Sequence, residues 1–327
     1  MATAEQLKSL IRSHYNNEVE LFSTVALQVA AHEAKQGHTV LAVEIQQLVD
    51  SLSVKGRGAN RHFHPDLKGL VLSEDTQTPK SALVIPEDLN VRIDRIIHEY
   101  RQRAKLKKYG LMHRRKILLI GPPGTGKTMT ASVLANELHL TLNTIQVDRL
   151  VTKFMGESSA KLRLIFDLIE RETAVYFFDE FDAIGGDRAL DNDVGEMRRI
   201  LNAFLQFIEQ DRSDSVIIAA TNNPGLLDQA LFRRFDDILY FGHPEEDERK
   251  RLVENLLSAF IPSRFSWKKV VEEGKGLSHA EIDHACRDAL KETILSDDQA
   301  VSSAKLIHAL QERQKVNRNL LESKSPK

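Results

Sequence analysis

The strongest constraint on the fold is the segment Gly121-Pro122-Pro123-Gly124-Thr125-Gly126-Lys127-Thr128. It fits the pattern G-x-x-x-x-G-K-[ST] at every fixed position. An apolar run over residues 117–120 precedes it, and a helical pattern over 129–138 follows. A chance glycine-rich turn is the alternative, but it would not need this strand–loop–helix order. The order predicts a buried strand that ends in a phosphate-binding loop, where backbone N–H groups and a helix N-terminus attract anions.

Two side chains of this segment carry specific chemistry. Lys127 supplies a full positive charge for the β- and γ-phosphates of a nucleotide. The Thr128 hydroxyl is placed to hold Mg²⁺, which prefers oxygen ligands. With Met129 at the start of the helix, residues 121–129 form the predicted nucleotide-binding set.

Composition narrows the class of protein. The chain has 327 residues, of which 42% are hydrophobic, so it can form one large or two medium domains. Its formal net charge of -2 gives no overall attraction to nucleic acid or to an anionic membrane. The single cysteine, Cys286, excludes an intrachain disulfide and fits a reducing compartment. No apolar run approaches the roughly 18 residues of a membrane span, and no signal-peptide pattern opens the chain, so we expect a cytoplasmic protein without a membrane partner.

The pattern along the chain predicts four parts. Apolar residues recur at helical spacing over 1–53, which predicts a small N-terminal helical bundle that docks a partner or substrate. Glycine and proline interrupt 54–85, which we expect to be a linker with room for one short strand. Residues 86–243 alternate strand and helix patterns, and only helical patterns remain over 244–327.

The alternating part predicts the fold class. Its strand candidates are mostly continuous apolar runs, typical of a parallel sheet covered on both faces. They lie at 117–120, 142–147, 174–179, 216–221 and 238–241. We therefore expect an α/β fold with a five-stranded parallel sheet, helices on both faces and a helical region after it. The first helix, 86–109, ends in a basic run that is typical of a solvated face, with nucleic-acid binding as the alternative.

Polar residues at two strand ends are candidates for catalysis. Asp179 and Glu180 end an apolar strand 52 residues after Lys127. Asp179 is expected to hold Mg²⁺, and Glu180 to orient and polarise an attacking water; a solvated strand end is the alternative. Asn222 ends the following strand, where its amide can reach the same water or the γ-phosphate. The alternative for Asn222 is a turn-forming role.

Arg233 and Arg234 are adjacent and lie soon after this strand. Paired arginines are commonly surface charge. Guanidinium groups supplied by a neighbouring subunit, however, are a known way to stabilise a transferring phosphoryl group. We therefore predict a catalytic role for both.

The chain resembles the AAA ATPases over about residues 86–316. The resemblance rests on the order of the phosphate loop, the acidic strand end, the asparagine and the arginine pair. It also rests on the segment Lys153-Phe154-Met155-Gly156-Glu157, which follows the phosphate loop. The resemblance implies a hexameric ring that hydrolyses ATP with Mg²⁺, and a helical lid after the α/β domain. It also implies that Arg233 and Arg234 reach the ATP of the neighbouring subunit and that Asn222 is the sensor asparagine. Lys153, Phe154, Met155 and Gly156 match the pore loop, whose aromatic residue grips a threaded polypeptide. An aromatic ring packed under its own loop is the alternative for Phe154.

Two segments depart from the family pattern. Residues 276–282 resemble G-x-S-G-A-[DE]-[IL], which lies beside the adenine, but His279 stands in place of the second glycine. His279 and Ala280 are therefore assigned to the nucleotide site. The Arg233-Arg234-Phe235 segment is similar to the compact form of katanin, spastin and small bacterial relatives, and either arginine can be the principal finger.

Three functions are compatible with this reading. The first is an ATP-driven ring that remodels or threads a protein substrate. The second is a ring that assembles on ATP and controls a separately encoded effector, for example a protease. The resemblance leaves this open, because small bacterial AAA proteins of this layout can be coupled to partner enzymes, including in phage defence. The third is a nucleic-acid motor, which is less favoured because it would need a basic pore.

Overall fold

The computed structural model describes residues 25–30, 43–45, 65–150, 157–185, 193–227 and 229–324. The chain divides into two compact units, Met1–Phe63 and His64–Lys327. In the first unit, residues 25–30 and 43–45 are helical, and Val25 and Val29, one helical turn apart, are buried. The remainder of the predicted bundle over 1–53 lies outside the described residues, so the bundle stays a prediction.

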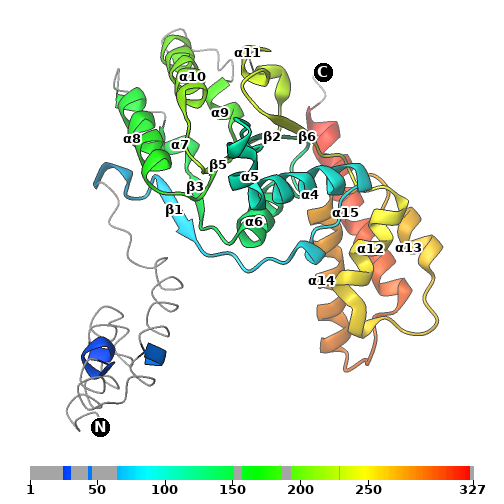
Figure 1. Cartoon of the computed structure of the whole chain (residues 1–327). Helices are drawn as coiled ribbons and strands as arrows, with labels where there is room; N and C mark the ends of the chain where they lie inside the picture. The colour runs from blue at the N-terminus through cyan, green and yellow to red at the C-terminus, as the bar shows by residue number, and fades with distance from the viewer. Residues whose placement is uncertain are drawn as a thin grey trace. The chain divides into compact units, whose positions relative to one another are not determined.

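The second unit is built on a six-stranded sheet with the order β1-β3-β4-β5-β2-β6 (Figure 1). Every neighbouring pair is parallel except β1 with β3. The strands are β1 (Val71–Glu74), β2 (Lys116–Ile120), β3 (Leu142–Ile145), β4 (Val175–Phe178), β5 (Val216–Thr221) and β6 (Asp237–Tyr240). The predicted α/β fold is confirmed. All five predicted strands are present, and β1 adds an antiparallel strand at one edge.

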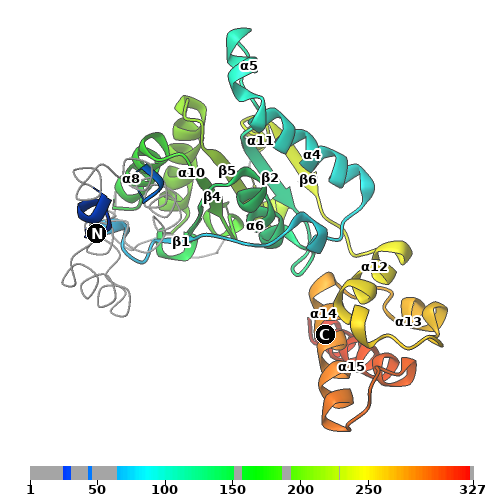
Figure 2. The ribbon, with the colours of Figure 1, turned by 60° about the horizontal axis from the view of Figure 1, so that its bottom comes forward.

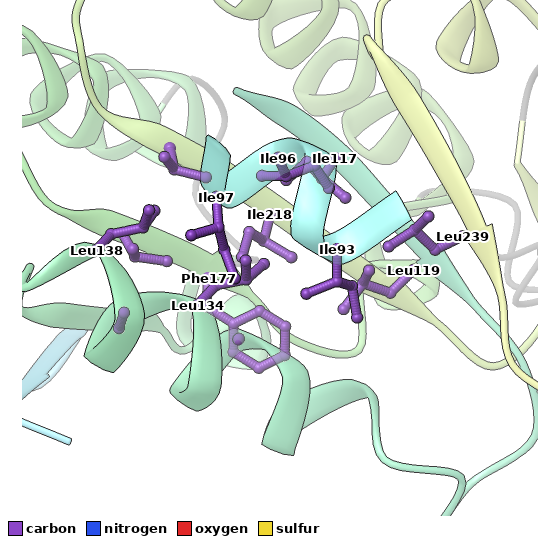
Figure 3. Packing of buried hydrophobic residues seen from close by; sticks show 14 of the residues in the cluster. Ile93, Ile96, Ile97, Ile117, Leu119, Leu134, Leu138, Phe177, Ile218 and Leu239 are labelled. Carbon is purple, nitrogen blue, oxygen red and sulfur yellow. The ribbon is translucent and has the colours of Figure 1, made fainter. Parts of the chain in front are cut away.

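Helices cover both faces of the sheet. The helices of this part of the unit are α4 (Glu87–Arg101), α5 (Arg103–Lys108), α6 (Lys127–Leu138), α7 (Val147–Leu150), α8 (Glu157–Arg171), α9 (Asp182–Gly185), α10 (Asp193–Gln210) and α11 (Gln229–Phe232), of which α5 buries no residue. On one face, Ile93 and Ile97 of α4 and Leu134 of α6 pack around Phe177 of β4 (Figure 3). On the other face, the neighbouring residue Phe178 contacts the ring of Phe166 in α8 and that of Phe204 in α10. Successive strand residues point to opposite faces, so both faces of β4 must be apolar, as the sequence predicted.

The segment before α4 is more than a linker. Val71 of β1 pairs with Ile145 of β3, and the Ser73 hydroxyl donates to Asn143 Oδ1 at 2.5 Å. Residues 65–85 therefore belong to the folded second unit, which corrects the predicted linker over that stretch. The first predicted helix is also divided, because α4 ends at Arg101 and α5 begins at Arg103.

Four helices form the C-terminal region: α12 (Glu246–Leu257), α13 (Trp267–Glu273), α14 (His279–Leu295) and α15 (Ser303–Lys324). Their core is joined by a residue from far earlier in the chain, Val84, which packs with Leu277 and Ile282. The Arg251 guanidinium donates to the backbone oxygen of Ile85 at 3.1 Å. Residues 84–85 thus attach the helical region to the start of α4. Of the helices in the described ranges, none combines the length and the apolar character that crossing a membrane requires.

Candidate nucleotide site

The predicted phosphate-binding loop connects β2 to α6, as the sequence requires. Gly126 caps α6 with a left-handed backbone (φ 100°), a conformation that glycine adopts without steric cost. Gly121 has another reason to be glycine: a Cβ atom there would lie 2.2 Å from the backbone oxygen of Phe241. Since Phe241 directly follows β6, the loop begins in close contact with the neighbouring strand.

Lys127 is buried inside this loop, with 7% of its surface exposed. Its ammonium group donates to the backbone oxygens of Gly121 (2.7 Å) and Pro122 (2.8 Å) and to Asn222 Oδ1 (2.7 Å). Burial lowers the pKa of Lys127, while the nearby carboxylate of Asp179 acts in the opposite direction. The structure therefore brings Lys127 and Asn222 together, as expected of two residues at one phosphate site.

The residues predicted to hold Mg²⁺ also meet. The Thr128 hydroxyl donates to Asp179 Oδ2 at 3.2 Å, across the gap between α6 and β4. A hydroxyl and a carboxylate are oxygen donors of the kind that Mg²⁺ takes beside nucleotide phosphates, so this pair fits the ion. Glu180 follows with an exposed side chain and a left-handed backbone (φ 50°), and its N–H donates to Asp179 Oδ1 at 2.9 Å. A non-glycine residue in this conformation is strained, as is found at functional sites.

One residue of this cluster was not predicted. Asp182, the first residue of α9, accepts a hydrogen bond from the backbone N–H of Asn222 at 3.3 Å. This contact ties the end of β5 to the turn after β4, and so sets where the Asn222 amide lies. The sequence offered one sign of this role, because Asp182 is a third acidic residue, three positions after Asp179.

The C-terminal helical region lies directly on the loop. Ser278 caps α14 in a capping box, with its N–H bonded to Glu281 Oε2 at 2.6 Å. The first turn of α14 brings the Ala280 N–H to the backbone oxygen of Gly124 at 3.0 Å. A Cβ atom on Gly124 would lie 2.9 Å from Ser278 Oγ and 3.0 Å from Ala280 Cβ. Gly124 therefore makes room for the lid as well as for a ligand.

A cavity of about 1000 Å³ opens between the loop and the lid. Its polar end contains Lys127, Thr128, Asp179, Glu180 and Asn222, and its other walls come from Ser81–Val84, Met129, Leu252, Leu256, His279 and Ala280. The volume suits a nucleotide. The wall of residues 81–84 was not predicted, because these residues belong to a segment that was expected to be a linker.

His279 replaces a small residue of the family pattern at the wall of this cavity. Burial lowers its pKa to about 4, and the nearby His243 acts in the same direction. The ring is therefore neutral at pH 7 and adds no positive charge to this wall of the cavity.

We expect Gly124→Ala to loosen the lid and to weaken nucleotide binding. The left-handed backbone (φ +74°) makes a β-carbon cost about 1–2 kcal/mol, and the crowding against Ser278 and Ala280 adds to this. Gly110→Ala is the matched control, because Gly110 has nearly the same φ (+73°) and nothing within 4 Å of the added carbon. Thermal unfolding and nucleotide titration of the two variants check this. If Gly124→Ala and Gly110→Ala lose the same thermal stability and nucleotide affinity, the contact between Gly124 and the lid contributes to neither.

The two predicted arginines differ in their surroundings. Arg233, just after α11, is exposed. Arg234 is half-buried, and its Nε lies 3.0 Å from Glu209 Oε2 of α10. Neither is among the described residues that line the cavity. The predicted pore loop, Lys153, Phe154, Met155 and Gly156, lies outside the described residues.

Comparison with known proteins agrees with this geometry. Residues 117–243 match the model of the ATPase family associated with various cellular activities (AAA). An uncharacterized AAA family ATPase of Sinorhizobium fredii is 32% identical over 95% of this chain and 96% of its own length. A 26S proteasome regulatory subunit homolog of Methanocaldococcus jannaschii is 31% identical over 76% of this chain and 71% of its own. The meiotic spindle formation protein mei-1 of Caenorhabditis elegans is 34% identical over 53% of this chain and 38% of its own length. With a phosphate loop, a paired Thr128 and Asp179, and a relative that matches along nearly its whole length, the chain belongs to the AAA family of ATPases.

Proposed function

We propose that this ATPase works as a homo-hexameric cytoplasmic ring that remodels or threads a protein substrate. The observation that carries the ring is the place of Arg233. Lys127, Thr128, Asp179, Glu180 and Asn222 line one cavity, whereas Arg233 is exposed and is not among the described residues that line it. If Arg233 acts on a phosphoryl group, this position suits a nucleotide that is bound by another copy. The single, buried cysteine fits the reducing cytoplasm.

We assign the steps of ATP hydrolysis to residues that line the cavity of one subunit and to Arg233 of a neighbouring subunit. Lys127 and the loop N–H groups bind the phosphates, and Thr128 and Asp179 hold Mg²⁺. The ion, when bound, draws charge from the phosphate oxygens. Glu180, at the exposed end of β4, accepts a proton from the attacking water. Asn222, held by Asp182, orients this water, and Arg233 of the neighbour stabilises the transferring phosphoryl group.

The remodelling step rests on Phe154 and on the relatives. Two matched relatives carry names that refer to a proteasome regulatory subunit and to meiotic spindle formation, so chains of this kind serve protein assemblies. An aromatic ring offers apolar contact to an extended chain of any sequence, which suits a gripping role.

Phe154→Ala should keep most of the basal ATP hydrolysis and lose mechanical work on a protein. The Phe154 side chain is expected to touch the protein substrate and not the nucleotide. The variant should therefore lose unfolding of the substrate while its rate of ATP hydrolysis changes little. Turnover and the unfolding of a tagged fluorescent protein measure the two. Full remodelling activity, or an unfolded variant, would show that Phe154 packs under its own loop.

The second candidate, an assembly switch for a separate effector, gives a different result in one experiment. A Glu180→Gln ring held in its ATP state should capture an extended protein if it threads, and should release it after hydrolysis is allowed by mixing in wild-type subunits. An effector would instead bind stoichiometrically at the rim and stay folded. Capture of nucleic acid alone would contradict both proposals. Residues 1–53 are the proposed docking part in either case.

A further inference from the structure

Asp236 follows the arginine pair and ends the short stretch that leads from α11 into β6. We call residues 233–236 the finger segment. One oxygen of the Asp236 carboxylate, Oδ2, accepts hydrogen bonds from two backbone N–H groups, those of Arg115 (3.0 Å) and Lys116 (2.9 Å). The Asp236 N–H in turn donates to the backbone oxygen of Lys116 at 2.7 Å. These bonds hold the end of the finger segment on the start of β2.

The start of β2 is a firm support for these bonds. Arg115 is buried, and its guanidinium forms an ion pair with the buried carboxylate of Asp211 and donates to the Asp211 backbone oxygen at 2.6 Å. The backbone oxygen of Arg115 accepts from the N–H of Ile217 in β5 at 2.6 Å. Breaking a buried ion pair is costly, because the remaining charge is left without its partner. The Asp236 carboxylate is therefore bound to a part of the sheet that does not shift easily.

The other residues of the finger segment differ in how they are held. Phe235 is buried, and Arg234 lies 3.0 Å from the Glu209 carboxylate of α10. Arg233 is exposed, and within the ranges that the structure describes its side chain forms no hydrogen bond or ion pair. The neighbours of Arg233 are thus fixed while its own guanidinium stays available. This is the arrangement of a functional side chain that is held in place by the residues around it.

The attachment lies at the edge of the sheet that is opposite to the phosphate loop. β6 runs beside β2 (Figure 2), and Asp237 at its start pairs with Ile117 near the start of β2. The phosphate loop follows Ile120, at the other end of β2. The 5 residues of β2 correspond to about 16 Å of strand between these two ends. Asp236 therefore fixes the finger segment away from the chain's own phosphate site, which suits an arginine that serves another copy.

We propose that Asp236 is a positioning residue for ATP hydrolysis. By holding the finger segment on β2, it sets where Arg233 stands in the nucleotide site of the neighbouring subunit. This inference rests on the proposed function, in which Arg233 acts between subunits, and adds the group that places this arginine. Asp236 does not touch the nucleotide and acts only through Arg233. Placement matters because a shift of about 1 Å at a catalytic group costs on the order of 10²-fold in rate.

Two substitutions of Asp236 in the full chain test this role. Asp236→Ala removes the acceptor for both N–H groups and should lower ATP turnover by about 10- to 100-fold, with ATP affinity near that of the wild type. Asp236→Asn keeps an acceptor oxygen and should recover part of the turnover. Asp237→Asn is the matched control, because the Asp237 carboxylate pairs with Arg92 of α4 and not with β2, and its turnover should stay near the wild-type rate. If thermal unfolding shows that Asp236→Ala is not folded, Asp236→Asn carries the same test with a smaller expected loss.

Two further measurements separate positioning from a general weakening of β2. In a chain that already carries Arg233→Ala, adding Asp236→Ala should lower single-turnover hydrolysis no further, because the carboxylate acts through that arginine. Mixing Asp236→Ala subunits with Lys127→Ala subunits should restore activity. The first kind of subunit keeps an intact phosphate loop and the second keeps an intact finger segment, so a mixed ring contains some complete sites.

The outcomes distinguish this inference from the proposed function. Wild-type turnover in Asp236→Ala, a further loss in the double variant, or no recovery in mixed rings whose formation sedimentation confirms would each overturn the positioning role. The proposed function would still stand if Arg233→Ala has low turnover and recovers activity in its own mixture with Lys127→Ala. Wild-type turnover in Arg233→Ala would instead overturn the proposed function, and the role of Asp236 with it.

Discussion

Replacing Glu180 by glutamine is expected to lower ATP turnover by roughly 10²–10⁴-fold and to leave ATP affinity near that of the wild type. The amide keeps the size and polarity of the side chain but cannot accept the proton of the attacking water. The carboxylate lies at the exposed end of β4, beyond the groups that hold the phosphates, so its loss should not disturb the loop. Single-turnover hydrolysis and nucleotide titration measure the two quantities separately.

Two further variants make the result specific. Lys127→Ala should lose nucleotide binding itself, because the buried ammonium group is the cation at the centre of the loop. Glu170→Gln, which removes an exposed carboxylate on α8, should change neither quantity. Hydrolysis at the wild-type rate in Glu180→Gln would remove Glu180 from the mechanism.

Arg233→Ala should lower turnover by about 10³–10⁵-fold, the effect of an arginine finger where one acts. Arg234→Ala should have a smaller effect, because the Arg234 side chain is already engaged by Glu209 of its own chain. ATP binding should survive in both variants, since neither residue lines the chain's own cavity among the residues described there. Steady-state turnover and nucleotide titration check this order, with the exposed Arg264→Ala as control.

Subunit mixing shows whether the arginine acts between chains. An Arg233→Ala subunit keeps Lys127, and a Lys127→Ala subunit keeps Arg233, so a mixed ring contains some complete sites. Activity should therefore reappear on mixing two nearly inactive variants. If mixed rings form and stay inactive at every ratio, the shared site is excluded.

Part of this site is predictable from sequence because its residues stand at fixed distances from strand ends. Lys127 and Asp179 each follow the carboxyl end of a predicted strand, and the carboxyl ends of parallel strands lie at the same edge of a sheet. The two strands β2 and β4 therefore predict that the loop and Asp179 lie close together. The same reasoning placed Asn222, whose contact with Lys127 the structure shows at 2.7 Å.

Other features of the fold and of the site could not be placed from the sequence, for physical reasons. The sequence left room for one short strand between 54 and 85 but did not show where it lies or what it pairs with, because β1 has only four residues and alternates between buried and exposed positions. The cavity wall at 81–84 lacks a residue pattern of its own. The docking of Ala280 on Gly124 depends on tertiary approach, which a pattern read along one chain does not record. The difference between Arg233 and Arg234 arises from Glu209, a residue on another helix.

The attachment of Val84 and Ile85 to the lid has a consequence for synthesis. These residues are made well before the lid residues that cover them, because the bond from Arg251 to Ile85 spans 166 residues. Until translation reaches that point, Val84 is an apolar side chain without its partners, and the lid's core lacks a member. Completion of the lid is therefore a late, long-range step of folding, and long-range steps are slow. Nascent chains should therefore expose Val84 until the lid has been made, and exposed apolar surface of this kind is prone to aggregation.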